Sequence, residues 1–180
     1  AAAITHGHPT GQLASGTFAT IVMMLLVGVQ LPQAIDAALA HLKTQPGHEE
    51  TLYAIQHASR LALETPNNSE VLTQLGGGWI AEEALAIAVY CALSAKDFRS
   101  GVTLAVIHSG DSDSTGSIAG QLLGAIYGAH AIPSSWIGPL ELRVVIEEMA
   151  DDMATLNDWD LENETSTDEV DFYFERYPGW

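Results

Sequence analysis

Two carboxylates and neighbouring hydroxyls stand within five consecutive positions of this sequence. They belong to Asp111, Asp113, Ser114 and Thr115. Carboxylate and hydroxyl oxygens are the ligands that hard cations such as Mg²⁺ prefer. The residue types and their spacing therefore predict a cation site in which Asp111 and Asp113 are ligands and either Ser114 or Thr115 adds a hydroxyl.

The apolar segment that follows this acidic loop indicates the helix that must position it. Glycines recur there every four residues, so they fall on nearly the same side of a helix. Each interior glycine costs about 1 kcal/mol relative to alanine, and another helix packed very close would compensate for that cost. We therefore expect a central, buried helix with the acidic loop at its N-terminal end. The glycines are Gly116, Gly120, Gly124 and Gly128.

Three other interpretations compete with a cation site. Asp111 or Asp113 could be an N-cap, the commoner role of a single aspartate before a helix. An EF-hand calcium loop fits at its first positions, but Leu122 stands where the bidentate glutamate should be. A membrane-spanning Gly-xxx-Gly helix fails because the apolar run 118–127 is far shorter than the roughly 20 residues that cross a bilayer.

The composition is typical of an ordinary soluble protein and limits what the chain binds. Hydrophobic residues make up 47% of its 180 residues, enough for one domain with a sizeable core. The chain has 6 Lys and Arg against 23 Asp and Glu, a net charge of −17. This charge argues against nucleic-acid binding, which needs clustered basic residues, and against an anionic membrane surface.

The cysteine content and the apolar runs bear on the compartment. Cys91 is the only cysteine, so no disulfide forms within the chain, and its apolar neighbours predict a buried, inert thiol. A reducing, cytoplasmic setting is consistent with this. No signal peptide is recognisable, and the apolar stretch 18–29 is too short to span a membrane, so we expect a core helix there.

Helical periodicity and capping residues predict an all-α chain. Asp97 is expected to cap one of the helices, and the stripe of apolar residues in the last helix is expected to face a core. The only candidate strand is 170–174. Helices are expected over residues 12–29, 32–42, 49–63, 69–75, 97–107, 116–128 and 141–156, with one more beginning at 82.

A run of three glycines, residues 76–78, precedes the helix that begins at 82. Such a run serves as a plain loop or lets a ligand come close, and the two roles are about equally common. Trp79, which follows it, could stack on a ligand or lie in the core. Glu82 and Glu83 are explained by the favourable interaction of negative charge with a helix N-terminus.

Three blocks of the sequence occur in an order that is known from one family. Residues 4–9 read Ile-Thr-His-Gly-His-Pro, residues 76–85 read Gly-Gly-Gly-Trp-Ile-Ala-Glu-Glu-Ala-Leu, and residues 110–114 read Gly-Asp-Ser-Asp-Ser. They resemble the Thr-His-x-His-Pro, Gly-x-Gly-Trp-x-x-Glu-Glu-Ala-Leu and Gly-Asp-x-Asp-[Thr/Ser] blocks of the ADP-ribosylglycohydrolases. With the segment that follows, the resemblance covers about residues 4–140.

The resemblance implies a compact multi-helix fold of which residues 1–156 are the C-terminal half. The blocks of the family's N-terminal half have no counterpart in the sequence, so we expect that half to be a partner of this chain and to carry the catalytic acid or base. Alone, the chain should be inactive. Residues 157–180 combine 8 acids with 6 aromatic residues, and we expect this segment to pack on the domain, because disordered acidic tails are poor in aromatics.

The resemblance also implies an activity and a set of site residues. The family hydrolyses the N-glycosidic bond between ADP-ribose and a protein side chain, usually arginine. Two Mg²⁺ ions, with Mn²⁺ as the alternative, would be held by Asp111, Asp113 and Ser114. By the same resemblance, His6, Gly78 and Trp79 would contact the ADP-ribose.

One departure from the family pattern affects the expected substrate. Ser112 and Ser114 stand where the commoner pattern has threonine, which keeps the hydroxyls but leaves the linkage that is cleaved open. A non-catalytic ADP-ribose-binding or structural relative is the alternative. Both aspartates are present, which argues against it.

Overall fold

The structure is a computed structural model that describes residues 1–156 and 175–177. The regular elements in these two ranges are all helices, so the predicted all-α fold is confirmed. The candidate strand at 170–174 lies outside the described residues. The chain divides into two units, Ala1–Ser134 and Ser135–Trp180, each of which is described by itself. The predicted boundary after residue 156 stays a prediction.

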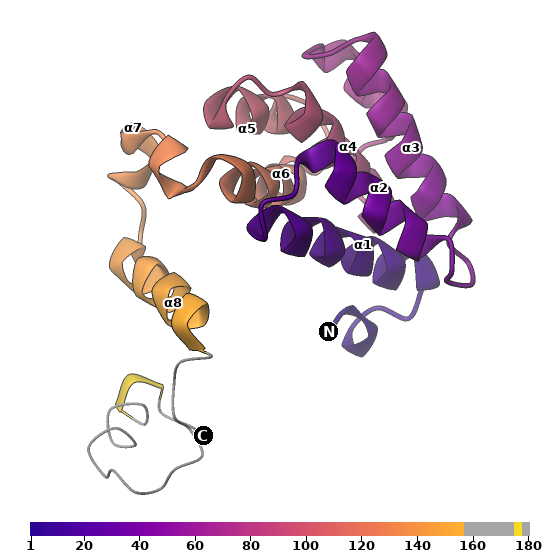
Figure 1. Cartoon of the computed structure of the whole chain (residues 1–180). Helices are drawn as coiled ribbons and strands as arrows, with labels where there is room; N and C mark the ends of the chain where they lie inside the picture. The colour runs from indigo at the N-terminus through magenta and orange to yellow at the C-terminus, as the bar shows by residue number, and fades with distance from the viewer. Residues whose placement is uncertain (157–174, 178–180) are drawn as a thin grey trace, which may run out of the picture. The chain divides into compact units, whose positions relative to one another are not determined.

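The first unit is built of α-helices joined by short loops and short 3-10 helices (Figure 1). Most predicted helices appear within about three residues of their expected ends. In chain order the elements are η1 (Ala2–Ile4), α1 (Pro9–Leu26), α2 (Leu31–Leu42), α3 (Glu49–Glu64), η2 (Ser69–Leu75), α4 (Ala81–Ser94), α5 (Phe98–Val106), α6 (Ser112–Tyr127) and η3 (Ala129–Ala131).

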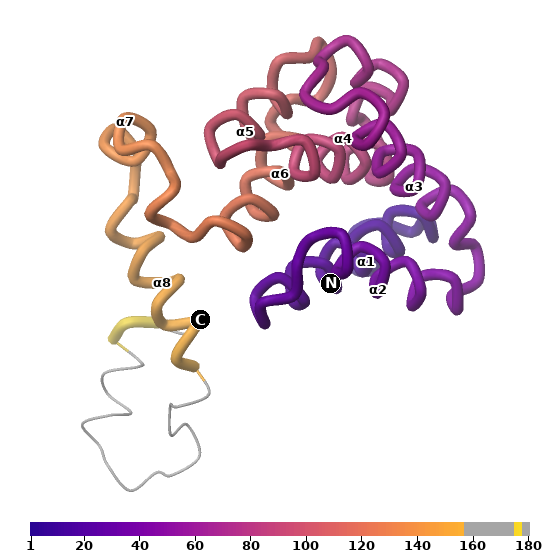
Figure 2. The backbone as a smooth tube through the Cα atoms, turned by 45° about the horizontal axis from the view of Figure 1, so that its top comes forward, coloured from indigo at the N-terminus to yellow at the C-terminus, as the bar shows by residue number. Residues whose placement is uncertain are grey.

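Helix α4 is the centre of the first unit. Every residue from Ala84 to Ala92 is buried, as expected of a helix that is apolar on all sides. It packs against α1, α3, α5 and α6, and Figure 2 shows α3 beside α4 and α1 beside α2. Cys91 lies in this run, and burial raises the pKa of its thiol to about 12, which confirms the predicted inert thiol.

Helix α6 is also central, since it packs against α1, α4 and α5. Its glycines, however, do not face a close neighbour throughout. A Cβ at Gly116 would lie 2.6 Å from Cγ1 of Val106, whereas a Cβ at Gly120 or Gly124 would meet no atom of the described residues within 4 Å. The prediction of a helix packed along the whole glycine face is therefore wrong. The residues that α6 buries are Thr115, Ala119, Leu122 and Leu123.

A tyrosine of α4 fixes the connection between α3 and η2. The hydroxyl of Tyr90, which is fully buried, donates a hydrogen bond to the carbonyl of Thr65 at 2.7 Å and accepts one from the N–H of Asn68 at 3.0 Å. Because η2 leads directly into residues 76–78, this contact also limits where the triple-glycine loop can lie.

The second unit contains most of α7 (Ser134–Ile137) and all of α8 (Arg143–Thr155). The apolar stripe of α8 was expected to face a core, but it is exposed, because the described part of this unit has no second long helix to cover it. Met153, for example, is 75% exposed. The described part of the chain has no helix with the length and apolar character needed to cross a membrane.

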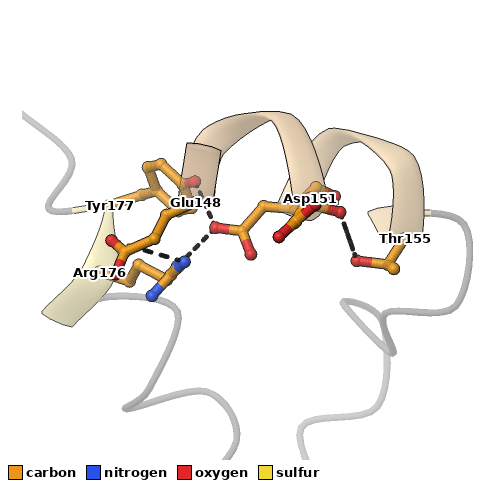
Figure 3. A network of polar contacts seen from close by, with 6 residues as sticks. Glu148, Asp151, Thr155, Arg176 and Tyr177 are labelled. Carbon is orange, nitrogen blue, oxygen red and sulfur yellow. Dashed lines mark hydrogen bonds and ion pairs between the residues drawn. The ribbon is translucent and has the colours of Figure 1, made fainter. Parts of the chain in front are cut away.

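Residues 175–177 contact α8 through side-chain hydrogen bonds (Figure 3). Arg176 donates to the carboxylate of Asp152 and lies 3.9 Å from that of Glu148. The hydroxyl of Tyr177 donates to Asp152 at 2.6 Å. Tyr177 therefore contacts α8, while the other aromatic residues of 157–180 lie outside the described residues.

Candidate active site

The acidic loop lies at the N-terminal end of α6, as predicted, but its residues from Ser112 onward form the first turn of the helix and not a loop before it. Asp111 is the N-cap residue, but its side chain makes no capping hydrogen bond. Asp113 lies in the first turn, and its carboxylate accepts a hydrogen bond from the N–H of Ser114 at 3.0 Å. Neither carboxylate is therefore explained as a helix cap. An EF-hand loop is excluded as well, because the helix already begins at Ser112.

The carboxyl groups of Asp111 and Asp113 contact each other. The pKa of Asp113 lies below its ordinary value because the side chain of Asp111, and then the N–H of Ser114, hydrogen-bond to its carboxylate. Neighbouring carboxylates repel each other unless a cation lies between them. The pair is suited to bind a cation.

Of the two hydroxyls that could complete this site, that of Thr115 is engaged elsewhere. Thr115 is fully buried, and its hydroxyl donates to the carbonyl of Ala105 at 2.7 Å. Nδ1 of His108 accepts a hydrogen bond from the N–H of Gly110 at 3.1 Å. The proton of His108 is therefore on Nε2, which donates to Thr115 at 2.9 Å. Ser114 is left as the residue that presents a hydroxyl beside the two carboxylates.

The triple-glycine loop, residues 76–78, lies against the acidic loop. The N–H of Asp111 donates to the carbonyl of Gly77 at 2.8 Å. Gly78 has a φ of +77°, and a Cβ there would lie 2.8 Å from Cγ2 of Thr115. The positive φ and this close contact both require glycine, so the glycine run serves to bring the two loops together.

Glu83 holds the glycine loop from its other side. Its Oε2 accepts hydrogen bonds from the N–H of Gly77 at 3.0 Å and from that of Gly78 at 3.1 Å. The sequence did not indicate this role, because the position of Glu83 in the first turn of α4 already explains an acidic residue. The sequence does contain one indication of it. Glu83 follows shortly after a glycine loop whose N–H groups make no helical hydrogen bonds and therefore need other acceptors.

A pocket of about 800 Å³ opens beside the two loops, and the turn before α1 forms another part of its wall. Five of the six predicted site residues line it, and Asp113 is adjacent but does not. Trp79 is 72% exposed, so it is not a core residue and its ring is accessible. The five lining residues are His6, Gly78, Trp79, Asp111 and Ser114.

The wall that carries His6 is fixed by polar contacts. Gln12 donates to the carbonyl of His6 at 2.9 Å, and Nδ1 of His6 lies 2.8 Å from the hydroxyl of Thr5. Behind this turn, the buried hydroxyl of Thr10 donates to Glu50 at 2.6 Å, which joins α1 to α3. Nothing in the sequence pattern indicated that Thr10 and Glu50 are partners, because they lie 40 residues apart.

The ligands that this chain could offer to a cation are few. In the described ranges, no group of three or more His, Cys, Asp or Glu side chains is gathered as a metal site. Asp111, Asp113 and Ser114 would provide two carboxylates and a hydroxyl, whereas Mg²⁺ takes six oxygen ligands, including waters. The donor types fit Mg²⁺, and the set is a partial one.

Several known proteins are similar to this chain. The ADP-ribosyl-[dinitrogen reductase] glycohydrolase of Rhodospirillum rubrum is 45% identical over 26% of this chain and 16% of its own length. ADP-ribosylhydrolase ARH3 of Mus musculus is 24% identical over 75% of this chain and 44% of its own length. ADP-ribosylarginine hydrolase Tri1 of Pseudomonas putida is 28% identical over 39% of this chain and 19% of its own length.

These relatives are longer than the chain, which spans less than half the length of each of them. No solved structure is significantly similar to it. The sequence model of one family matches residues 1–163, which include the histidine turn, the glycine loop and the acidic loop. The chain therefore belongs to the ADP-ribosylglycohydrolase family.

Proposed function

We propose that this chain is part of a Mg²⁺-dependent hydrolase that cleaves the N-glycosidic bond between ADP-ribose and a protein side chain. Among the possible linkages, we propose ADP-ribosyl-arginine as the main substrate. The observation that carries the proposal is that the histidine turn, the glycine loop and the acidic loop all line the same pocket. The names of two relatives, which refer to ADP-ribosyl-dinitrogen reductase and to ADP-ribosylarginine, support a modified protein as the substrate.

The acidic loop would hold the cation. Asp111 and Asp113 fit this role because their carboxyl groups contact each other and neither caps the helix, and Ser114 adds a hydroxyl at the pocket. We expect two Mg²⁺ ions, or Mn²⁺ in their place. When bound, such ions orient a substrate hydroxyl and activate water.

The opposite part of the pocket would bind ADP-ribose. The exposed ring of Trp79 offers a flat surface for stacking, and Gly78 leaves room for close approach beside Asp111. His6 is held in place through its carbonyl and through Nδ1, so its ring edge has a defined position.

The remaining parts of the site would come from outside this chain. The relatives extend well beyond the matched regions, and the chain offers only a partial set of cation ligands. We therefore propose that an N-terminal polypeptide supplies further ligands and the catalytic acid or base, and that the chain alone is inactive. A cytoplasmic location is part of the same proposal.

The test combines the chain with the N-terminal polypeptide of the same enzyme and supplies an ADP-ribosyl-arginine protein with and without Mg²⁺. Wild type should release ADP-ribose only with Mg²⁺. Asp111→Asn and Asp113→Asn should each slow the release by about 100-fold or more, since cation stabilisation of the transition state contributes several kcal/mol. Asp36→Asn, which removes an exposed acid from α2, is the matched control and should leave release unchanged.

Two outcomes would contradict the proposal. Release without Mg²⁺, at a rate that the two aspartate variants do not change, would mean that the acidic loop has no part in the reaction. Binding of ADP-ribose without any release would favour the non-catalytic binding module.

A further inference from the structure

We propose that Glu83 is a positioning residue that fixes the backbone of the acidic loop through one peptide group of the glycine loop. The peptide group in question joins Gly77 to Gly78. Its N–H donates to Oε2 of Glu83 at 3.1 Å, and its carbonyl accepts from the N–H of Asp111 at 2.8 Å. Glu83 and Asp111 are thus connected by two consecutive hydrogen bonds.

The charge of Glu83 strengthens this connection. Hydrogen bonds to a carboxylate are roughly twice as strong as neutral ones, and consecutive hydrogen bonds polarise one another. A carboxylate that draws on the N–H of this peptide group makes its carbonyl a better acceptor for the N–H of Asp111. The same Oε2 also accepts from the N–H of Gly77 at 3.0 Å, so the loop is held at two consecutive peptide groups.

The glycines around this connection are required by the same contacts. A Cβ at Gly76 would overlap the carboxyl group of Glu83, and a Cβ at Gly110 would overlap the carbonyl of Gly77. A side chain at Gly76 would therefore push Glu83 away from the glycine loop, and a side chain at Gly110 would push the acidic loop away from it. Packing and hydrogen bonding independently indicate the same line of contacts.

A simpler explanation is that Glu83 acts only as a negative charge at the N-terminus of α4. Glu82 tests that explanation within the same helical turn, because it carries the same charge one residue earlier, and it accepts no hydrogen bond from residues 76–78 in the structure. If charge at the helix end were the whole effect, Glu82 and Glu83 would be equivalent.

The experiment compares Glu83→Ala, Glu83→Gln and Glu82→Ala in the full chain by amide hydrogen exchange. Loss of a hydrogen bond to a charged group should speed exchange at Asp111 by about 10- to 100-fold in Glu83→Ala. Glu83→Gln keeps an oxygen that can accept both bonds, so exchange should be intermediate. Glu82→Ala should change it by less than about twofold. Exchange at buried α4 amides such as that of Val89 reports global unfolding. The exchange rates of these amides must therefore change less than that of the Asp111 amide.

The result that overturns the proposal is an Asp111 exchange rate that does not change in Glu83→Ala, or that changes equally in Glu82→Ala or in the α4 amides. Failure of glutamine to restore any protection would also overturn it, because the loss would then be one of charge and not of the two hydrogen bonds.

A second measurement connects this role to the reaction and rests on the proposed function. In the complete enzyme, Glu83→Ala should lower the kcat of ADP-ribose release, with partial recovery in Glu83→Gln. If the wild-type enzyme releases no ADP-ribose, the proposed function fails, while the exchange result at Asp111 still decides the role of Glu83.

Discussion

Ser114 and Thr115 are adjacent and both carry a hydroxyl, yet their positions in the first turn of α6 give them different environments. Thr115 points toward α5 and donates to Ala105, whereas Ser114 lines the pocket. The sequence could place a hydroxyl at this loop but could not decide which of the two would reach the cation, because that depends on the rotation of α6 against α5.

The buried hydroxyl of Tyr90 allows a sharp test of a single contact. Tyr90→Phe would leave the carbonyl of Thr65 and the N–H of Asn68 without this partner, so the free energy of unfolding should fall by about 1–3 kcal/mol. Denaturant unfolding would measure it. Tyr53→Phe, in a residue of α3 that is 65% exposed, should change it by less than about 0.5 kcal/mol. Equal effects would contradict the account.

The contact of Arg176 and Tyr177 with Asp152 should depend on pH. The pKa of Asp152 is lowered from 3.8, first by its hydrogen bond with Arg176 and then by that with Tyr177. A lowered pKa in the folded state means that the contact stabilises the fold above the ordinary aspartate pKa and is lost as the pH falls through the folded-state value.

NMR titration of the Asp152 carboxyl checks this expectation. Arg176→Gln should raise the pKa of Asp152 toward 3.8, and Tyr177→Phe should raise it less, because the arginine is the larger cause. A titration of Asp152 that neither substitution changes would show that these contacts do not persist in solution.

Among the helices, a glycine outside the repeating pattern is packed as tightly as Gly116. Gly101 of α5 makes the close approach to α6: a Cβ there would lie 2.6 Å from Cδ1 of Leu123 and 2.8 Å from Cβ of Ala95. Periodicity indicates which residues share a face, but it cannot tell which helix will cover that face. That explains why α6 itself was predicted correctly and the packing of its glycines was not.

Alanine substitution distinguishes these glycines. Gly120→Ala should raise the free energy of unfolding of the chain by about 0.5–1 kcal/mol, because alanine favours the helix and the added methyl meets nothing within 4 Å. Gly101→Ala should lower it by about 1–3 kcal/mol through overpacking against Leu123. Denaturant unfolding of both variants measures the difference. Destabilisation by Gly120→Ala would mean that another element covers this face in solution.

For the whole molecule, local sequence blocks predicted residues that gather at the candidate site, but not the contacts that hold this site together. Five of the six predicted residues line one pocket, and each of them lies in one of the three blocks that carry the family resemblance. The residues that hold the pocket in shape were missed: Glu83, Thr10 and Glu50 act through long-range contacts or backbone groups, which leave no periodic signal in a single sequence.

The net charge of −17 should make the stability of the chain depend on salt, because self-repulsion opposes the compact state. NaCl is expected to raise Tm through screening alone. MgCl₂ at the same ionic strength should raise it further if the acidic loop binds the cation. At ten times the Kd, the additional stabilisation is about 1.4 kcal/mol, or about 3–6 °C in Tm for a chain of this size.

Charge-matched variants separate binding from screening. Asp111→Asn combined with Asp113→Asn should abolish the additional rise in Tm with MgCl₂ and keep the rise with NaCl. Asp36→Asn combined with Glu70→Gln removes the same charge from exposed positions away from the acidic loop, and it should retain both. Because only the change on adding salt is compared, the effect of lower net charge on the starting Tm cancels. If all three proteins respond equally to the two salts, the acidic loop of this chain does not bind Mg²⁺ without further ligands.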